Sequence, residues 1–286
     1  PDYIWKNKEK VKLNNVNNKG TDYTHDLFAD YTVDFITRNK DKPFFLYLPF
    51  CIPHDAYELP DNGDYENKPW DTEAKAYAAM ISRMDKNVGR IIQTLKDMDI
   101  DDNTYVFFTS DNGATQSSVD WGLFDSNAPL RGIKRDPYEG GIRVPMIVRH
   151  PKRIKTGTTS DLPWYFADVL PTLAEIAGLT PPENIDGTSV LATMHAQPQD
   201  LSKRYMYWEF YEKMGWRAIR FGDWKAIQNN MNLGDKDPIE LFNLKDDISE
   251  KVNLADQHPE MVAKAVAIFN ASHVPSEHFV WKYLNK

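Results

Sequence analysis

The sequence contains very little cysteine: Cys51 is the only one among 286 residues. An internal disulfide framework and a cysteine-rich zinc site are therefore excluded. A single cysteine does not identify the cellular compartment, so this absence limits the chemistry of the chain and leaves its location open.

The sequence also lacks a basic block, an internal repeat, a low-complexity tract and an apolar run long enough to span a membrane. Its first residues, PDYIWK, do not resemble a signal peptide. The net charge of −8 argues against nucleic acid or an anionic membrane as the main partner. Because the chain does not begin with Met, we expect a processed or truncated piece of a protein.

What is present is enough to build a substantial core. Hydrophobic residues make up 41% of the chain and aromatic residues 13%, which argues against disorder. A chain of this length forms one large domain or two unequal ones.

Helical and strand patterns alternate over the first two thirds of the chain. Helices are predicted at 22–38, at 71–98 with Asp71 as the N-cap, and at 164–177; buried strands are predicted at 43–48, 104–109 and 143–149. This alternation predicts an α/β domain over residues 1–198, with a mainly parallel central sheet flanked by helices.

The pattern changes after about residue 200. Short, closely spaced strands are predicted at 205–210, 216–221 and 224–228, with a turn at Gly222-Asp223 and a final helix at 259–270. We therefore expect residues 199–286 to form a smaller subdomain with an antiparallel sheet and a helix.

The segment Ser110-Asp111-Asn112-Gly113 ends one of the predicted buried strands. Ligands of parallel α/β sheets bind at this end of the strands. Asp111 and Asn112 offer hard oxygen ligands on adjacent residues, and such ligands suit Ca²⁺ or Mg²⁺ better than a soft metal. On these residues alone a strand-ending Asx turn is the simpler explanation, and both interpretations stay open.

Two further residues are candidates of the same kind. Lys134 is either a solvated lysine or, beside a metal, a point charge that holds an anion. His54 follows the predicted strand at 43–48 and is either structural or within reach of a ligand at the sheet edge. The segment Tyr138-Glu139-Gly140-Gly141 is typical of a turn, with glycines for close approach of the backbone.

The combination of these segments resembles the sulfatases of the alkaline-phosphatase-like superfamily. The resemblance rests on Phe44 to Leu48 leading to Pro53-His54, on Ser110-Asp111-Asn112-Gly113, and on L-R-G-x-K-x-x-x-Y-E-G-G-x-R-V-P at 130–145, in this order. The tail at 239–247 and 252–255 is similar to the C-terminal subdomain of that family, and the resemblance covers nearly the whole chain.

The resemblance implies roles for four residues. Asp111 and Asn112 would be two ligands of a divalent cation, with Ca²⁺ expected before Mg²⁺. His54 and Lys134 would contact the sulfate group and its leaving oxygen. The expected substrate is a sulfated small molecule or glycan, and a periplasmic or extracellular location is favoured.

The sequence departs from the family at the nucleophile. Sulfatases carry a formylglycine made from Cys or Ser in a C/S-x-P-x-R motif, but Cys51-Ile52-Pro53-His54-Asp55 has Asp55 where Arg is required. We therefore expect Cys51 to be an ordinary buried thiol and the formylglycine to lie upstream, with the remaining metal ligands. On this interpretation the chain alone is inactive, and its exposed sheet edge invites self-association.

Two alternatives stay open. A phosphoryl-transfer relative in the same superfamily would also place metals at strand ends. A non-catalytic glycan-binding module would instead use aromatic side chains such as Trp121, Trp208 and Trp216, although such residues more often pack in a core.

Overall fold

The computed structural model describes residues 1–17, 19–233 and 237–281. The chain divides into two compact units: the first comprises residues 1–106 and 149–153, and the second comprises 107–148 and the described residues from 154 onward. Each unit is described by itself. The boundary expected at residue 198 lies inside the second unit and stays a prediction.

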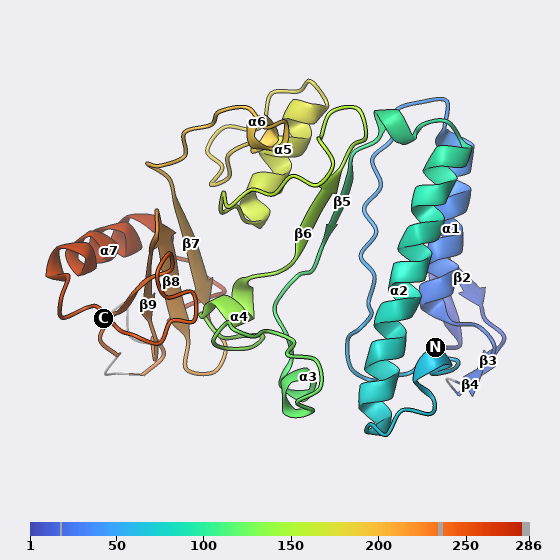
Figure 1. Ribbon diagram of the computed structural model, residues 1–286, viewed down its shortest axis with the longest axis horizontal. Helices are drawn as coiled ribbons and strands as arrows, with labels where there is room; N and C mark the ends of the chain where they lie inside the picture. Colours follow the sequence, from blue (N-terminus) through green and yellow to red (C-terminus); the bar gives the residue numbers. More distant parts are fainter. Residues whose placement is uncertain (18, 234–236, 282–286) are drawn as a thin grey trace. The chain divides into compact units, whose positions relative to one another are not determined.

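The first unit consists of two long helices and two small hairpins (Figure 1). Its elements are β1 (Tyr3–Lys6), β2 (Glu9–Lys12), β3 (Asn15–Val16), β4 (Lys19–Gly20), α1 (Thr24–Asn39) and α2 (Thr72–Asp97). Asp71 caps α2 as predicted, since its carboxylate accepts a hydrogen bond from the backbone N–H of Glu73 at 2.8 Å. Arg83 of α2 donates to Asp26 of α1 at 2.9 Å, so an ion pair joins the two helices.

The strand predicted at 43–48 is absent, and this prediction was wrong. Residues 43–50 are neither helix nor strand, and Phe45 and Tyr47 are 70% and 76% exposed. Burial alternates along the segment, as it does in a strand, but no described strand pairs with it. An apolar run specifies an extended backbone only; a strand also needs a partner for its hydrogen bonds. Self-association through this segment stays a prediction.

The other two predicted α/β strands are present and pair with each other. β5 (Val106–Thr109) and β6 (Met146–Arg149) form a two-stranded sheet. Within the described residues no larger central sheet is present, so the mainly parallel sheet is not shown in this structure.

The helix predicted at 164–177 is also present in shorter form. Its elements are a 3-10 turn at Phe166–Asp168 followed by α5 (Val169–Ile176), and the short α6 (Leu191–Met194) comes next. Asp168 is fully buried and accepts hydrogen bonds from the backbone N–H groups of Tyr165 and Thr188, both at 2.9 Å. This carboxylate therefore fixes two distant segments of backbone.

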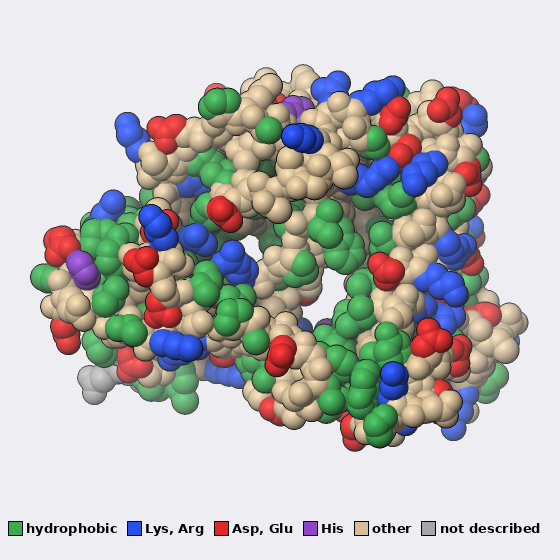
Figure 2. All heavy atoms as spheres, in the orientation of Figure 1, with side chains coloured by type: hydrophobic (Ala, Val, Ile, Leu, Met, Phe, Trp, Pro, Cys, Tyr) green, Lys and Arg blue, Asp and Glu red, His purple; other side chains and the backbone are tan. Residues whose placement is uncertain are grey.

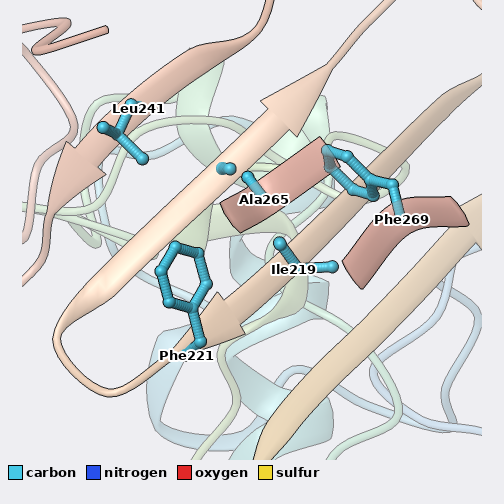
Figure 3. Close-up of a cluster of buried hydrophobic side chains, with 6 residues drawn as sticks. Ile219, Phe221, Leu241, Ala265 and Phe269 are labelled. Atoms are coloured by element: carbon cyan, nitrogen blue, oxygen red, sulfur yellow. The ribbon is translucent and has the colours of Figure 1, made fainter. Parts of the chain in front are cut away.

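The C-terminal antiparallel sheet is confirmed. It has the order β10-β9-β8-β7, from β7 (Tyr205–Phe210), β8 (Trp216–Phe221), β9 (Trp224–Gln228) and β10 (Glu240–Asn243), and α7 (Pro259–Ser272) packs on one face. Figure 3 labels Ile219, Phe221, Leu241, Ala265 and Phe269 of the buried cluster between sheet and helix, which also includes Ala226. Gly222 turns β8 into β9 with φ of +61°.

Charges of both signs are mixed on the surface. On the face drawn in Figure 2, Lys and Arg side chains are interspersed with Asp and Glu. Among the described residues, no helix combines the length and apolarity that crossing a membrane requires.

Candidate functional site

The Asp111-Asn112-Gly113 turn follows β5 directly. The Asn112 side-chain nitrogen donates to the Gly113 carbonyl at 2.9 Å, which leaves Oδ1 as the ligand atom of that amide. Asp111 is exposed, and within the described residues its carboxylate takes part in no hydrogen bond or ion pair. Asp111 therefore does not cap the turn as a simple Asx turn would require.

Glycines join this turn to the segment before β6. The Gly113 N–H donates to the Gly141 carbonyl at 3.0 Å, and a Cβ at position 113 would lie 1.9 Å from the Gly140 oxygen. No side chain fits in that space, so only glycine permits this approach of two backbones. The close backbone approach predicted from Gly140 and Gly141 is confirmed.

Lys134 belongs to the same loop system. Its backbone N–H donates to the Ala114 carbonyl at 2.7 Å, only three residues from Asp111. Gly132 has φ of +85°, and the indole N–H of Trp216 in β8 donates to the Arg135 carbonyl at 2.8 Å. The structure therefore brings together the loops of Asp111, Asn112 and Lys134.

A buried cluster of charges lies behind this loop and was missed from the sequence. Glu139 and Glu250 both contact the Lys225 ammonium at 2.9 Å, and Glu250 also accepts from the Glu139 N–H at 2.7 Å. The three side chains are 0–4% exposed. Since α4 (Glu139–Ile142) begins at Glu139, the cluster attaches this short helix to β9.

The cluster perturbs its two carboxyl groups in opposite directions. Burial raises the pKa of Glu139, but the cations Lys225, Arg220 and Arg143 outweigh this effect, and the net pKa is lowered. Burial dominates at Glu250, whose pKa is raised although Lys225 opposes the change. Glu139 is therefore the firmly ionised partner of Lys225.

Tyr138 supports the same segment from its other side. Its hydroxyl donates to Glu240 of β10 at 2.9 Å, and the Arg131 guanidinium lies 3.7 Å from its ring centroid. Burial, together with the hydrogen bond to Glu240, raises the pKa of Tyr138 to about 12. Tyr138 is therefore neutral and acts as a hydrogen-bond donor.

His54 lies in the first unit and has different surroundings. The side chain is exposed, and Nδ1 lies 2.7 Å from the Asp55 carbonyl and 3.0 Å from the Asp55 carboxylate. Nδ1 is therefore engaged by Asp55, the next residue in the chain. Cys51, three residues earlier, is exposed, so the prediction of a buried thiol was wrong.

The oxygen ligands fit part of a cation site. Carboxylate and amide oxygens suit a hard divalent cation. Among the described residues, however, no three His, Cys, Asp or Glu side chains gather as a metal site. Asp111 and Asn112 thus fit as two ligands of a divalent cation. The described residues do not supply the rest of its coordination shell.

The tryptophans considered for glycan binding are packed instead. Trp208 lies edge-on to Tyr165 with centroids 5.7 Å apart, and Trp216 stacks on Phe210 at 5.4 Å. Both also pack against a buried cluster of the C-terminal sheet. Trp121 contacts Phe124 edge-on at 6.0 Å.

Comparison with known proteins decides the family. A family model described as Sulfatase matches residues 2–179, and one described as N-sulphoglucosamine sulphohydrolase, C-terminal, matches residues 120–268. The chain belongs to the sulfatase family. The four candidate residues of this sulfatase chain, at positions 54, 111, 112 and 134, all lie within the matched segment 2–179.

Two curated relatives illustrate the extent of this similarity. A sulfatase from Formosa agariphila is 32% identical over 85% of this chain and 48% of its own length. N-acetylgalactosamine-6-sulfatase from Homo sapiens is 34% identical over 73% of this chain and 40% of its own length. The sulfatase chain described here thus spans 48% and 40% of the lengths of these two relatives.

Solved structures show the same fold similarity. Ps i-CgsB matches with a TM-score of 0.81 and 30% identity, over 93% of this chain and 56% of that one. The same protein is known in complex with k-i-k-neocarrahexaose. Another match, with a TM-score of 0.55 and 26% identity, covers 70% of this chain and 41% of a protein bound to its substrate, D-glucosamine-2-N,6-O-disulfate.

Proposed function

We propose that the protein containing this chain is a sulfuric ester hydrolase that acts on a sulfated carbohydrate. The observation that carries the proposal is the junction of the Asp111-Asn112 turn with the Lys134 loop, in a chain of the sulfatase family. The carbohydrate is favoured because similar proteins are named for, or solved with, sulfated sugars.

Each candidate residue has a role in this proposal. Asp111 and Asn112 would hold a divalent cation, Ca²⁺ before Mg²⁺, and this cation would offset negative charge on the sulfate group. Lys134 would add a fixed positive charge at the same group. His54 would donate a proton to the departing oxygen, which makes the alcohol a better leaving group.

The nucleophile is assigned outside these residues. Cys51 lies in the segment of His54, and Asp55 stands where the formylglycine motif has Arg. We therefore propose a formylglycine elsewhere in the full-length protein, and an extracytoplasmic location in keeping with the family. The 286-residue chain alone would then bind an anion weakly without hydrolysing sulfate esters.

The test is release of inorganic sulfate by the purified full-length protein. Substrates are a sulfated N-acetylgalactosamine, a carrageenan oligosaccharide, an aryl sulfate and a phosphate monoester, each with Ca²⁺ and with chelator. Sulfate release from a sugar, lost with chelator, supports the proposal. Faster hydrolysis of the phosphate monoester would favour the phosphoryl-transfer alternative, and turnover by the 286-residue chain alone would refute the assignment of the nucleophile.

A further inference from the structure

The β1–β2 hairpin of the first unit has two different faces. Its register pairs Tyr3 with Lys12, Ile4 with Val11 and Trp5 with Lys10. Ile4 is 8% exposed, whereas Tyr3 and Trp5 are 42% and 60% exposed. Because side chains alternate across a strand, two aromatic rings and two lysines share the outward face.

These outward side chains form one connected surface. The Tyr3 and Trp5 rings lie edge to face with centroids 6.1 Å apart. The Lys10 ammonium lies 4.4 Å from the Tyr3 centroid and 5.4 Å from the Trp5 centroid. The cation is therefore positioned by the rings, and the rings stay accessible to a further apolar surface.

The charge of the hairpin differs from that of the whole chain. Residues 3–12 contain four lysines and one acidic residue, although the net charge of the chain is −8. The acidic Glu9 pairs with Lys6 in the register and so lies on the other face from Trp5. The outward face is thus positive and aromatic in an acidic protein.

We propose that this outward face, comprising Tyr3, Trp5, Lys10 and Lys12, is a binding surface for a sulfated polysaccharide. The C–H face of a pyranose ring is apolar and packs on an exposed aromatic ring, while lysine ammonium groups pair with sulfate. Nucleic acid offers similar chemistry. The choice of a sulfated glycan rests on the proposed function, because a sulfatase acting on polymers gains from a second contact with its substrate.

Affinity electrophoresis of the full-length protein through gels with dextran sulfate, or with unsulfated dextran, tests the proposal. Dextran sulfate should retard the protein and unsulfated dextran should not. The double variant Lys10→Gln/Lys12→Gln should weaken binding about tenfold, and Trp5→Ala roughly fivefold, as expected for the loss of one or two exposed contacts.

Matched variants control for charge and for exposed aromatic surface. Lys40→Gln/Lys42→Gln removes the same charge from exposed positions of the same unit, and Phe166→Ala removes a ring that is 56% exposed in the second unit. Both should bind dextran sulfate like the unchanged protein. Circular dichroism of each variant confirms that the fold is kept.

Three results would overturn the inference: no retardation by dextran sulfate, equal weakening in the two double-lysine variants, or equal competition by single-stranded DNA of matched charge. The proposed function is judged separately, by hydrolysis of a small sulfate ester. Hydrolysis without polymer binding would reject the binding surface only. Polymer binding without hydrolysis would reject the proposed function and leave the binding surface in place.

Discussion

Two segments carry the residues that the proposed function needs, and they are held in different ways. The loop at 110–141 is fixed by backbone hydrogen bonds within itself and by the buried ion pairs of Lys225. The segment at 43–54 is extended and contacts α1 through ring pairs, Phe44 on Phe35 and Phe50 on His25. The first depends on charge and backbone geometry, and the second depends on aromatic packing.

This difference separates two kinds of residue within the family motif: those that fix the backbone and those that would contact the substrate or cation. Motif residues such as Gly113, Gly141 and Glu139 do not touch the substrate in our proposal; they fix the backbone that presents Asp111 and Lys134. His54 contacts Asp55, the next residue in its own loop. Four experiments test this contrast.

The largest effect is expected for Asp111→Ala in the full-length protein. Removal of an anionic ligand leaves the cation under-neutralised, so sulfatase activity should be abolished and Ca²⁺ affinity reduced. Isothermal titration with Ca²⁺ and an assay of sulfate release measure the two effects. Asp161→Ala, which removes an exposed carboxylate of the same unit, is the control. Unchanged Ca²⁺ affinity in the Asp111 variant would refute its assignment as a ligand.

Lys134→Ala and His54→Ala compare the two segments directly. Each should lower kcat by on the order of 10²-fold, because each side chain acts on charge that develops in the transition state. The His54 variant should retain more activity on a substrate with a good leaving group, whereas the Lys134 variant should not. Steady-state kinetics with sugar and aryl sulfates measure this, with Lys155→Ala and His278→Ala as exposed controls. A wild-type rate in a folded variant would remove that residue from the site.

Lys225→Met tests the support of the 110–141 loop. It leaves two buried carboxylates without their shared cation, and the free energy of unfolding should fall by about 3–5 kcal/mol. Chemical denaturation measures this change, and Lys245→Met at an exposed position should have little effect. If both variants unfold at the same denaturant concentration, the ion pairs do not stabilise the loop.

The smallest effect concerns pH and the segment at 43–54. His25 is 3% exposed, neither ring nitrogen has a hydrogen-bond partner among the described residues, and burial lowers its pKa although Asp26 opposes the change. The unfolded chain therefore takes up a proton before the folded one does. Stability should fall as the pH drops below about 6.5, the value for an unperturbed histidine.

The measurement for His25 is the thermal unfolding midpoint at several pH values between 7.5 and 5. His25→Phe keeps a ring beside Phe50 and removes the titration, so the midpoint should depend less on pH. His278→Gln removes an exposed histidine and should leave the pH dependence unchanged. Identical profiles for all three proteins would exclude His25 as the source of acid sensitivity.

The sequence predicted the helices and strands that are specified by their own residues. The strands β7 to β9 follow from short, closely spaced runs rich in aromatic residues, and α2 follows from its N-cap and apolar spacing. The segment at 43–48 has the composition of a strand, but no residue within it specifies a pairing partner. The hairpin of Trp5 was not singled out, because its surface forms only when two strands pair.

The candidate site residues could be named from the sequence where short motifs contain them, and their roles stay predictions. Asp111, Asn112 and Lys134 stand out through the glycines around them, whereas Glu139 has the composition of an exposed turn. Its partners Lys225 and Glu250 lie 86 and 111 residues away. A single sequence contains no sign of a contact over such separations, apart from a lysine between two apolar residues of β9.

The position of Glu250 also has a consequence for synthesis of the protein. During translation, Glu139 leaves the ribosome 111 residues before the carboxylate that completes its cluster. At common elongation rates this interval is roughly 5–20 s. Throughout it, the loop of Lys134 lacks the anchor of Glu250, and the nascent chain must remain soluble with Glu139 hydrated. A stop codon before residue 250 would leave the ammonium of Lys225 with one carboxylate instead of two, so a truncation at that point removes an ion pair that holds the loop of the candidate site.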